Sequence, residues 1–318
     1  MKTLHCDKKI AVLLATYNGE KYLREQLDSL LAQDFDDFAC FIHDDDSTDN
    51  TREIIAEYCN TYPETFIEIK EQRTGEKGAR DNFLFLLKKV EADYYMYCDQ
   101  DDVWLPKKIS KTFSVIMKHT IGKPACVYTD LKVVDQKLNI ISNSYFSYRS
   151  LDPWRNSYKT LLIISICTGC TMMLNRMLRD EVLKLKCNSY IHMHDIDTAI
   201  TAALLGDIEF LDEPTILYRQ HNDNNVGANP QKGILSSIIH IFRDFGAARE
   251  RCLYFYRKAP RHLASDFEAL CTPGEKQTFL HELANIGQRY KLARMRFYVK
   301  NQLLPQRITR KLWGLLWV

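Results

Sequence analysis

The chain has 318 residues, of which 46% are hydrophobic, and a formal net charge of +2. This length allows a substantial core in roughly two domains, or in one large α/β domain with an appendage. No apolar run reaches the roughly 18 residues that cross a bilayer, and the opening MKTLHCDKK lacks the apolar core of a signal peptide. Ten cysteines without a disulfide-framework spacing favour a reducing compartment. We therefore expect a cytoplasmic protein without a secretory leader or a transmembrane helix.

The charge is unevenly distributed along the chain. Residues 289–318 contain eight lysines and arginines and no acid, so the preceding part carries a formal charge of −6. A basic tail beside an acidic body indicates an anionic surface as a partner. We expect this surface to be a membrane, and we expect no nucleic-acid partner.

The first third of the chain alternates between predicted strands and predicted helices. Short runs rich in apolar and β-branched residues predict strands over residues 10–15, 38–43, 66–69 and 94–98. Between them apolar residues recur at helical spacing, as Leu23, Leu27 and Leu30 do after the first strand. This alternation predicts a parallel α/β sheet with helices on both faces.

Polar side chains directly follow three of these strands. The clusters are Thr16-Tyr17-Asn18, Asp44-Asp45-Asp46 and Asp99-Gln100-Asp101-Asp102. Ligands of parallel sheets bind beyond the carboxyl ends of the strands, so we expect the three clusters to meet at one edge.

The third cluster brings three carboxylates together in the sequence DQDD. Like charges a few ångströms apart disfavour each other's ionisation, and a divalent cation removes that cost. Mg²⁺ and Mn²⁺ prefer oxygen ligands and are commonly bound by one or two carboxylates together with substrate phosphates. The cluster therefore predicts a metal and diphosphate site, and the alternative is a solvated acidic turn that caps the helix after Pro106.

The rest of the chain predicts short strands followed by helices. We expect strands over residues 125–130, 131–141, 165–174, 208–211 and 215–217, and helices over 176–185 and 196–205. Gly169 inside the third of these strands indicates the close approach of a ligand or of another backbone. From residue 232 onward the pattern is almost wholly helical.

Six sequence segments stand in order between about residues 10 and 227: VLLATYNGEKYLREQLDSLLAQ, DDDSTDNT, YCDQDDVWLPKK, ICTGCTMMLNR, HDID and YRQHNDNNVG. Together they resemble family 2 glycosyltransferases of the GT-A fold, most closely the bacterial rhamnosyltransferase-like branch. The resemblance implies an α/β, Rossmann-like domain over residues 1–230, with a mostly parallel central sheet and flanking helices. Residues 231–318 would form a helical C-terminal region that contacts a membrane surface or another subunit.

The resemblance also implies roles for nine residues. The nucleotide sugar would be bound by Thr16, Tyr17, Asp44, Asp45, Asp99 and Gln100. Asp101 would ligate the metal, Mn²⁺ or Mg²⁺, and His221 would complete the metal or diphosphate site. Asp195 matches the last acid of the family's ED-type motif and would be the general base.

Two of these residues have structural alternatives. Asp195 would otherwise cap the N-terminus of the following helix, since Asp is a favoured N-cap residue. A histidine in an Asn-rich loop, such as His221, would otherwise be a turn residue or a surface hydrogen-bonding group. A ligand role for His221 favours Mn²⁺, because neutral imidazole suits transition metals better than Mg²⁺. We expect Trp104 and His192 to have structural roles.

The chain departs from the family pattern at two positions. Asp46 stands where the family usually has Gly, and aspartate tolerates a left-handed backbone better than most residues. His194 replaces the acid that usually precedes the catalytic Asp, as is common in this branch. The QxxRW signature of processive synthases is absent, which favours the transfer of a single sugar.

Two segments near the end of the chain are both apolar and basic. They span residues 232–245 and 302–318, and Trp313 and Trp317 lie one helical turn apart in the second. Such a segment is typical of an amphipathic helix that lies in a membrane interface. We therefore expect peripheral binding at the inner face of the cell membrane. The alternative is packing on the catalytic domain or in a homodimer.

The expected function is that of an inverting, metal-dependent glycosyltransferase. It would move one sugar, rhamnose or another hexose, from a dTDP- or UDP-linked donor to a saccharide or lipid-linked glycan acceptor in bacterial surface polysaccharide synthesis. Transfer needs a metal to neutralise the leaving diphosphate, a base for the acceptor's proton, and alignment of both reactants. The alternatives are a non-catalytic nucleotide-sugar-binding or scaffold protein, and a Mg²⁺-dependent phosphotransfer receiver built on Asp44, Asp45 and Asp46.

Overall fold

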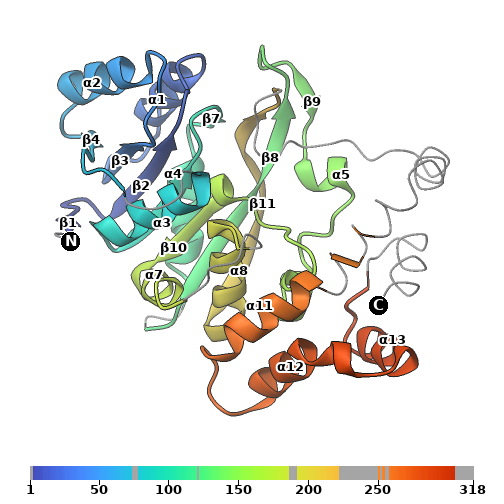
Figure 1. The fold of residues 1–318 in the computed structure, drawn as a ribbon. Coiled ribbons are helices and arrows are strands. Elements are labelled where there is room, and N and C mark those ends of the chain that lie inside the picture. Colours follow the sequence, from blue (N-terminus) through green and yellow to red (C-terminus); the bar gives the residue numbers. More distant parts are fainter. Residues whose placement is uncertain are drawn as a thin grey trace.

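The computed structural model describes residues 3–73, 78–119, 122–185, 192–221, 250, 253–254 and 258–304. Within these residues, nine strands form one sheet in the order β4-β3-β2-β6-β10-β8-β11-β7, with β9 paired to β8 (Figure 1). Its strands are β2 (Ile10–Thr16), β3 (Phe38–Asp44), β4 (Phe66–Glu68), β6 (Tyr94–Cys98), β7 (Val103–Trp104), β8 (Ala125–Val134), β9 (Ile140–Ser142), β10 (Met172–Asn175) and β11 (Asp207–Arg219). A separate parallel pair joins β1 (Leu4–His5) to β5 (Val90–Glu91).

Helices cover both faces of this sheet (Figure 1). The described helices are α1 (Leu23–Leu31), α2 (Thr51–Thr61), α3 (Ala79–Lys89), α4 (Lys108–Ile116), α5 (Tyr145–Arg149), α6 (Tyr158–Leu161), α7 (Arg176–Val182), α8 (His194–Leu205), α11 (Ala259–Glu268), α12 (Glu275–Ala284) and α13 (Lys291–Lys300). A short 3-10 turn, η1 (Gly169–Thr171), precedes β10.

The side chains of β2 alternate between two apolar clusters, one on each face of the sheet. Ala11 and Leu13 pack in the cluster that includes α3, α7, α8 and the C-terminal helices. Ile10, Val12 and Leu14 pack in the cluster that includes α1, α2 and α4. Burial on both faces explains why this strand is apolar from Ile10 to Ala15, as central parallel strands commonly are.

The first half of the sheet is parallel, as predicted. β2 pairs with β3 from Ile10 opposite Phe38 to Thr16 opposite Asp44. β2 also pairs with β6 up to Leu14 opposite Cys98, and β3 pairs with β4. This register brings the three polar clusters to the same edge of the sheet, which confirms the predicted convergence.

The second half of the sheet mixes directions. β10 lies antiparallel between β6 and β8, β11 runs parallel to β8, and β7 is antiparallel to β11. The predicted strands 208–211 and 215–217 are one strand, β11, whose pairing shifts register on either side of Pro214. Proline has no N–H for the ladder, which accounts for an irregularity at this point. The strand predicted over 165–174 begins only at Met172, because η1 precedes it.

The C-terminal helices α11, α12 and α13 pack on the side of the molecule that carries α8 (Figure 1). Leu263, Phe267, Leu280 and Tyr298 are buried in the same apolar cluster as Ile200 of α8. Their helical character confirms the prediction for the described part of this region, and the domain boundary near residue 230 stays a prediction. The segment 232–245 and residues 305–318, with Trp313 and Trp317, lie outside the described residues.

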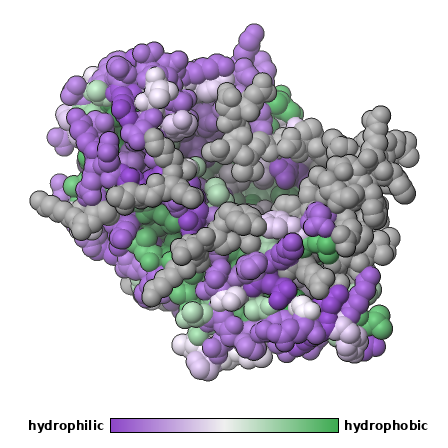
Figure 2. Space-filling view, in the orientation of Figure 1, coloured by the Kyte–Doolittle hydropathy of each residue, from purple (hydrophilic) through white to green (hydrophobic). Residues whose placement is uncertain are grey.

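The surface drawn in Figure 2 is mainly hydrophilic over the described helices, and its hydrophobic side chains lie in small groups. Tyr290 and Leu292, at the start of α13, are among the large exposed apolar residues. Among the described residues, we find no helix with the length and apolar character of a bilayer-spanning segment.

Candidate active site

The first two clusters meet at Asp44, which closes β3 opposite Thr16. Thr16 Oγ1 donates to Asp44 Oδ1 at 3.0 Å, and the Ser47 N–H donates to Asp44 Oδ2 at 2.8 Å. Arg52, whose side chain is 51% exposed, donates from Nε to Asp44 and from Nη2 to Asp46, both at 2.9 Å. Asp46 adopts a left-handed backbone with φ 65°, so the turn survives without glycine, as predicted.

Gln100 connects the first and third clusters. The Tyr17 N–H donates to Gln100 Oε1 at 2.8 Å, and Gln100 Nε2 donates to the Tyr17 carbonyl at 2.9 Å. These two bonds fasten the end of β2 to the turn after β6 and leave the Tyr17 side chain 53% exposed. Glycine at position 19 leaves room for these two bonds, because a Cβ there would lie 2.4 Å from Gln100 Oε1.

Replacing Gly19 with Ala is expected to lower the free energy of unfolding by about 1–3 kcal/mol, since Gln100 would have to leave the Tyr17 backbone. Urea titration measures the change. In a Gln100→Ala background the added methyl group has space, so the same substitution should cost less than about 0.5 kcal/mol. Equal costs in the two backgrounds would show that Gln100 is not the obstacle.

Asp45 is buried and accepts hydrogen bonds from two parts of the chain. Its carboxylate accepts from Arg73 Nη2 at 2.9 Å to each oxygen, and from the Gly78 N–H at 2.9 Å. Arg73 and Gly78 are the described residues on either side of segment 74–77. In this structure Asp45 therefore fixes the two ends of that segment to the end of β3.

Asp101 and His221 lie side by side although 120 residues separate them. His221 Nε2 is 2.7 Å from Asp101 Oδ2, and their side chains are 8% and 17% exposed. Two ligands at about 2.1 Å from one six-coordinate cation lie about 3 Å apart, so a small outward movement would admit Mg²⁺ or Mn²⁺. An oxygen and an imidazole nitrogen at this spacing fit the predicted metal, with Mn²⁺ the better match.

Asp99 supplies a second reason to expect a cation here. Burial, followed by the neighbouring carboxylates of Asp101 and Asp195, raises the pKa of Asp99 to about 7. Burial is the larger cause, and the part due to Asp101 is the like-charge cost that the DQDD sequence predicted. A cation beside these carboxylates would favour their ionised forms.

Asp102, the last residue of the cluster, has a structural environment that the sequence analysis did not foresee. It is fully buried, its Oδ1 accepts from the Arg219 N–H at 3.2 Å, and the Cys170 thiol lies beside its carboxylate. Ligand atoms of Asp99, Asp102 and Cys170 lie within 4.8 Å of one another. Lys108 is buried nearby, and burial lowers the pKa of its ammonium to about 8. A thiol and a nearby ammonium suit Mg²⁺ or Mn²⁺ poorly, so Asp101 and His221 fit the predicted metal better than this group does.

Arg219 is the second residue that sequence reasoning missed. It is buried, donates from Nε to the Asp101 carbonyl at 2.9 Å, and donates from Nη2 to Glu25 Oε2 at 2.5 Å. Its guanidinium also lies 4.5 Å from the centre of the Tyr22 ring. The only sequence signal was its place in YRQH, two residues before His221. Arg219 fixes the turn that presents Asp101.

Asp195 is the second residue of α8. Met193 occupies the N-cap position, so the alternative that Asp195 caps this helix is wrong. Its Oδ2 accepts from the Gly169 N–H at 3.3 Å and its Oδ1 from the Ile196 N–H at 2.8 Å. Burial raises the pKa of Asp195 to about 6, and these backbone donors oppose the rise.

His194, which replaces the family's acid, is packed against aromatic rings. Its ring centre lies 4.1 Å from that of Phe83 and 4.7 Å from that of Tyr97, and neither ring nitrogen has a hydrogen-bond partner in the described residues. Burial lowers its pKa to about 3, so the imidazole is neutral at physiological pH. Gly169 is required here, because a Cβ would lie 2.4 Å from His194 Nε2. The structural role expected of Trp104 is confirmed by its burial.

The predicted residues form one continuous set along the sheet edge. Hydrogen bonds join Thr16 to Asp44, Tyr17 to Gln100 and Asp101 to His221. Because Thr16 precedes Tyr17 and Gln100 lies within the DQDD turn, the three pairs are adjacent. No contact joins Asp195 to these pairs among the described residues, but its carboxylate is near enough to raise the pKa of Asp99.

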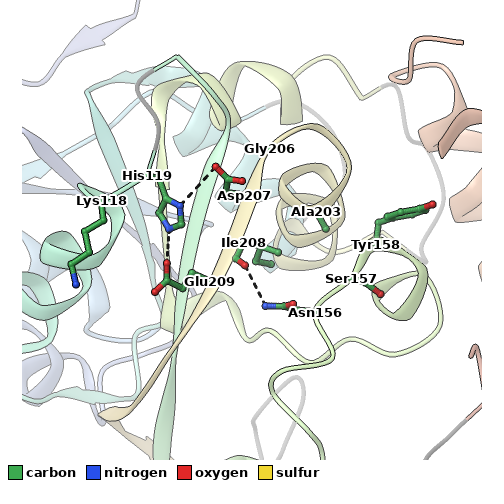
Figure 3. Close-up of a pocket in the computed structure, with 10 residues that line it drawn as sticks. All are labelled: Lys118, His119, Asn156, Ser157, Tyr158, Ala203, Gly206, Asp207, Ile208 and Glu209. Atoms are coloured by element: carbon green, nitrogen blue, oxygen red, sulfur yellow. Dashed lines mark hydrogen bonds and ion pairs between the residues drawn. The ribbon is translucent and has the colours of Figure 1, made fainter. Parts of the chain in front are cut away.

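A cavity of about 480 Å³ lies elsewhere, between the segment after α4, the end of α8 and the starts of α6 and β11 (Figure 3). The start of β11 pairs with the start of β8. His119 lies on one side of it, with Nε2 2.9 Å from Glu209 Oε2 and Nδ1 3.8 Å from Asp207 Oδ2. None of the nine predicted residues lines this cavity. The starts of these strands are opposite the edge that carries the polar clusters, so the cavity is separate from the candidate active site.

Comparisons with known proteins agree with this architecture. Residues 11–183 match the family model for glycosyl transferase family 2. The dTDP-rhamnosyl transferase RfbG of Shigella flexneri is 31% identical over 270 residues, covering 79% of this chain and 83% of RfbG. The UDP-Glc:alpha-D-GlcNAc-diphosphoundecaprenol beta-1,3-glucosyltransferase WfgD of Escherichia coli is 25% identical over 202 residues, covering 63% of this chain and 71% of WfgD.

A crystal structure of S. aureus TarS superimposes with a TM-score of 0.53 at 17% identity, covering 94% of this chain and 93% of that one. A second TarS structure, in complex with UDP-GlcNAc, has a TM-score of 0.51 at 16% identity with the same coverage. The fold is thus that of an α/β glycosyltransferase of the GT-A type. The chain belongs to glycosyl transferase family 2.

Proposed function

We propose that this protein is an inverting, metal-dependent glycosyltransferase that moves one sugar from a nucleotide-diphosphate donor to a saccharide or lipid-linked glycan. The observation that carries the proposal is the contact between Asp101 and His221 on the sheet edge where the polar clusters meet, with Asp195 near enough to raise the pKa of Asp99. The name of the Shigella relative supports dTDP-rhamnose as the donor. The name of the Escherichia coli relative supports an acceptor linked to a lipid diphosphate, as in bacterial surface polysaccharide synthesis.

The donor nucleotide would lie against the first two clusters. Both oxygens of Asp44 already accept hydrogen bonds, so a base or ribose donor must displace one of its partners. Arg52 is the partner most easily displaced, because it is half-exposed and reaches Asp44 from the surface. The exposed ring of Tyr17 provides a stacking surface for the base. Asp45 and Gln100 would support this surface, and Asp99 would lie near the ribose.

Asp101 and His221 would hold Mn²⁺ or Mg²⁺. The metal supplies Lewis-acid stabilisation of the charge that develops on the leaving diphosphate. Arg219 keeps the Asp101 turn in place through the bond to its carbonyl, so the ligand is presented by a buried and rigid support. A fixed support of this kind lowers the reorganisation needed during the reaction.

Asp195 would take the proton of the acceptor hydroxyl as that oxygen attacks the sugar. With a pKa near 6 it is ionised at neutral pH and still basic enough for general-base catalysis. The Gly169 and Ile196 N–H groups orient its carboxylate. A single displacement assisted by one base inverts the anomeric centre.

Release of nucleoside diphosphate tests the proposal against the non-catalytic alternative. We expect dTDP-rhamnose with Mn²⁺ to raise the melting temperature, and to yield dTDP when a membrane extract carrying lipid-linked glycans is added. EDTA should abolish release, and Asp195→Ala should keep the thermal shift while losing release. If a UDP-sugar raises the melting temperature and dTDP-rhamnose does not, the donor is that UDP-sugar and the rest of the proposal stands. Stabilisation by a donor without any release from the wild-type protein would favour a binding or scaffold protein.

A further inference from the structure

Helix α8, which begins with His194 and Asp195, is contacted at both ends by the C-terminal helices. Near its start, His192 Nε2 lies 2.9 Å from Asp266 Oδ2 of α11, and His192 Nδ1 is hydrogen-bonded to Asp197 Oδ1. At its end, Lys276 Nζ of α12 donates to the Leu204 carbonyl at 2.5 Å. A cation at a helix C-terminus satisfies a free carbonyl and complements the helix dipole. The C-terminal helices thus fix α8 from its first turn to its last.

The contact at the start of α8 is a buried ionic triad. The His192 side chain is fully buried and that of Asp197 is nearly so, whereas the Asp266 side chain is 35% exposed. An imidazole placed between two carboxylates donates from both nitrogens, an arrangement that favours the charged imidazolium. The ring also stacks on Phe267 of α11, with ring centres 6.0 Å apart. Removing one member of a buried ion pair leaves an uncompensated charge and strongly destabilises the folded protein.

The triad reaches the donor side of the molecule as well. Asp197 Oδ2 lies 3.9 Å from Arg80 Nη2 at the start of α3, the helix that follows segment 74–77. Asp266, His192, Asp197 and Arg80 therefore form a chain of alternating charge across α11, α8 and α3. Asp195 is separated from Asp197 by a single residue, so its carboxylate moves with the first turn that this chain fixes.

We propose that His192 and Asp266 are positioning residues that place Asp195 for proton transfer, with α11 as the supporting element. The proposal rests on the proposed base role of Asp195. A displacement of about 1 Å of a catalytic group can reduce a rate by about 10²-fold, so fixing this turn has a direct kinetic consequence. Asp266 lies outside the matched family segment, which ends at residue 183.

Charge gives the triad a second effect on Asp195. The Asp197 carboxylate raises the pKa of Asp195. A protonated His192, hydrogen-bonded to Asp197, would oppose that effect. The other ionisable groups that act electrostatically with Asp195 include Tyr97 of β6, Asp99 directly after β6, Tyr145 of α5, and Cys167. Burial raises the pKa of the two tyrosines and of the cysteine, so they are neutral at physiological pH. Loss of the His192 charge should therefore make Asp195 harder to ionise.

The test uses the full chain, Mn²⁺, dTDP-rhamnose and the glycan-bearing membrane extract. Asp266→Asn keeps the size of the side chain at a partly exposed site, and is expected to lower kcat about threefold to tenfold with the donor KM changed less than about twofold. His192→Gln should lower kcat further. It should also move the acidic limb of the pH profile of kcat to higher pH, by about half a pH unit or more. The matched control is Glu268→Gln, because Glu268 Oε1 contacts only His281 of α12, at 2.9 Å, among the ion pairs of the described residues.

Wild-type kcat in Asp266→Asn, or an equal loss in Glu268→Gln, would overturn the positioning role. An acidic limb at the wild-type pH in a folded His192→Gln protein would also overturn the positioning role. If His192→Gln does not fold, the split between kcat and KM in Asp266→Asn decides the question by the same criterion. An active Asp195→Ala protein would instead overturn the base role itself, so the two failures can be told apart.

Discussion

Replacing Asp195 with Asn is expected to lower kcat for sugar transfer by about 10³-fold, while the donor KM stays within about threefold. The amide keeps the size of the carboxylate and can still accept from the Gly169 N–H, but it cannot take the proton of the acceptor hydroxyl. Steady-state release of nucleoside diphosphate in the presence of acceptor measures the effect. An Asp195→Asn protein with more than about a tenth of wild-type kcat would exclude a general-base role.

The pH dependence follows from the same carboxylate. Because burial raises the pKa of Asp195 to about 6, the base is protonated and inactive below that pH and ionised above it. We therefore expect kcat to rise with pH through about 6 and to level off towards neutral pH. The residual activity of Asp195→Asn should lack this limb. A limb of the same shape in the variant would assign it to another group, such as Asp99.

Replacing Asp101 with Asn is expected to reduce kcat/KM by about 10²–10³-fold and to raise the Mn²⁺ concentration needed for half-maximal activity. The amide is a weaker ligand than the carboxylate, and it would share the site with an unaltered His221 only 2.7 Å away. The measurement is a Mn²⁺ titration of nucleoside diphosphate release.

Asp93→Asn is the matched control for this experiment. Asp93 precedes the same strand, β6, but lies at its opposite end, with an exposed side chain that pairs with Arg176. Its replacement should leave the metal requirement unchanged. If Asp101→Asn and Asp93→Asn behave alike, Asp101 is not a ligand, and the buried group of Asp99, Asp102 and Cys170 becomes the next candidate.

Much of the candidate site could be predicted because its parts follow local patterns. Apolar runs with polar residues after them placed Asp44 and Asp101 at strand ends, and the parallel register of β2, β3 and β6 made those ends coincide. The expected structural role of His192 is consistent with its burial between two carboxylates, but the sequence offered no sign of Asp266 as its partner. That contact joins residues 74 positions apart, and no local pattern encodes it.

Buried charge is the feature that sequence reasoning could not find. Arg219, Lys108 and Asp102 are residue types that are rarely buried, so their default placement is on the surface. Arg219 and Asp102 are buried at the turn after β6, where Arg219 bonds to the Asp101 carbonyl and Asp102 accepts from the Arg219 N–H. Lys108 is buried with its ammonium 4.6 Å from the centre of the Trp104 ring. The full extent of β11 was also missed, because two separate strands were predicted on either side of Pro214. In the structure the pairing with β8 continues on both sides of this proline.

The amino-acid sequence by itself determined the strand and helix alternation, the polar strand ends and the family. These depend on periodicity and on short motifs, which act over a few residues at a time. The family resemblance had placed His221 with Asp101, but only the tertiary structure decided other pairings, such as Gln100 with Tyr17 and Asp266 with His192. Those pairings follow from the packing of whole helices and strands. Burial of their apolar faces sets the positions of the backbones, and polar side chains that this packing brings within reach then form hydrogen bonds.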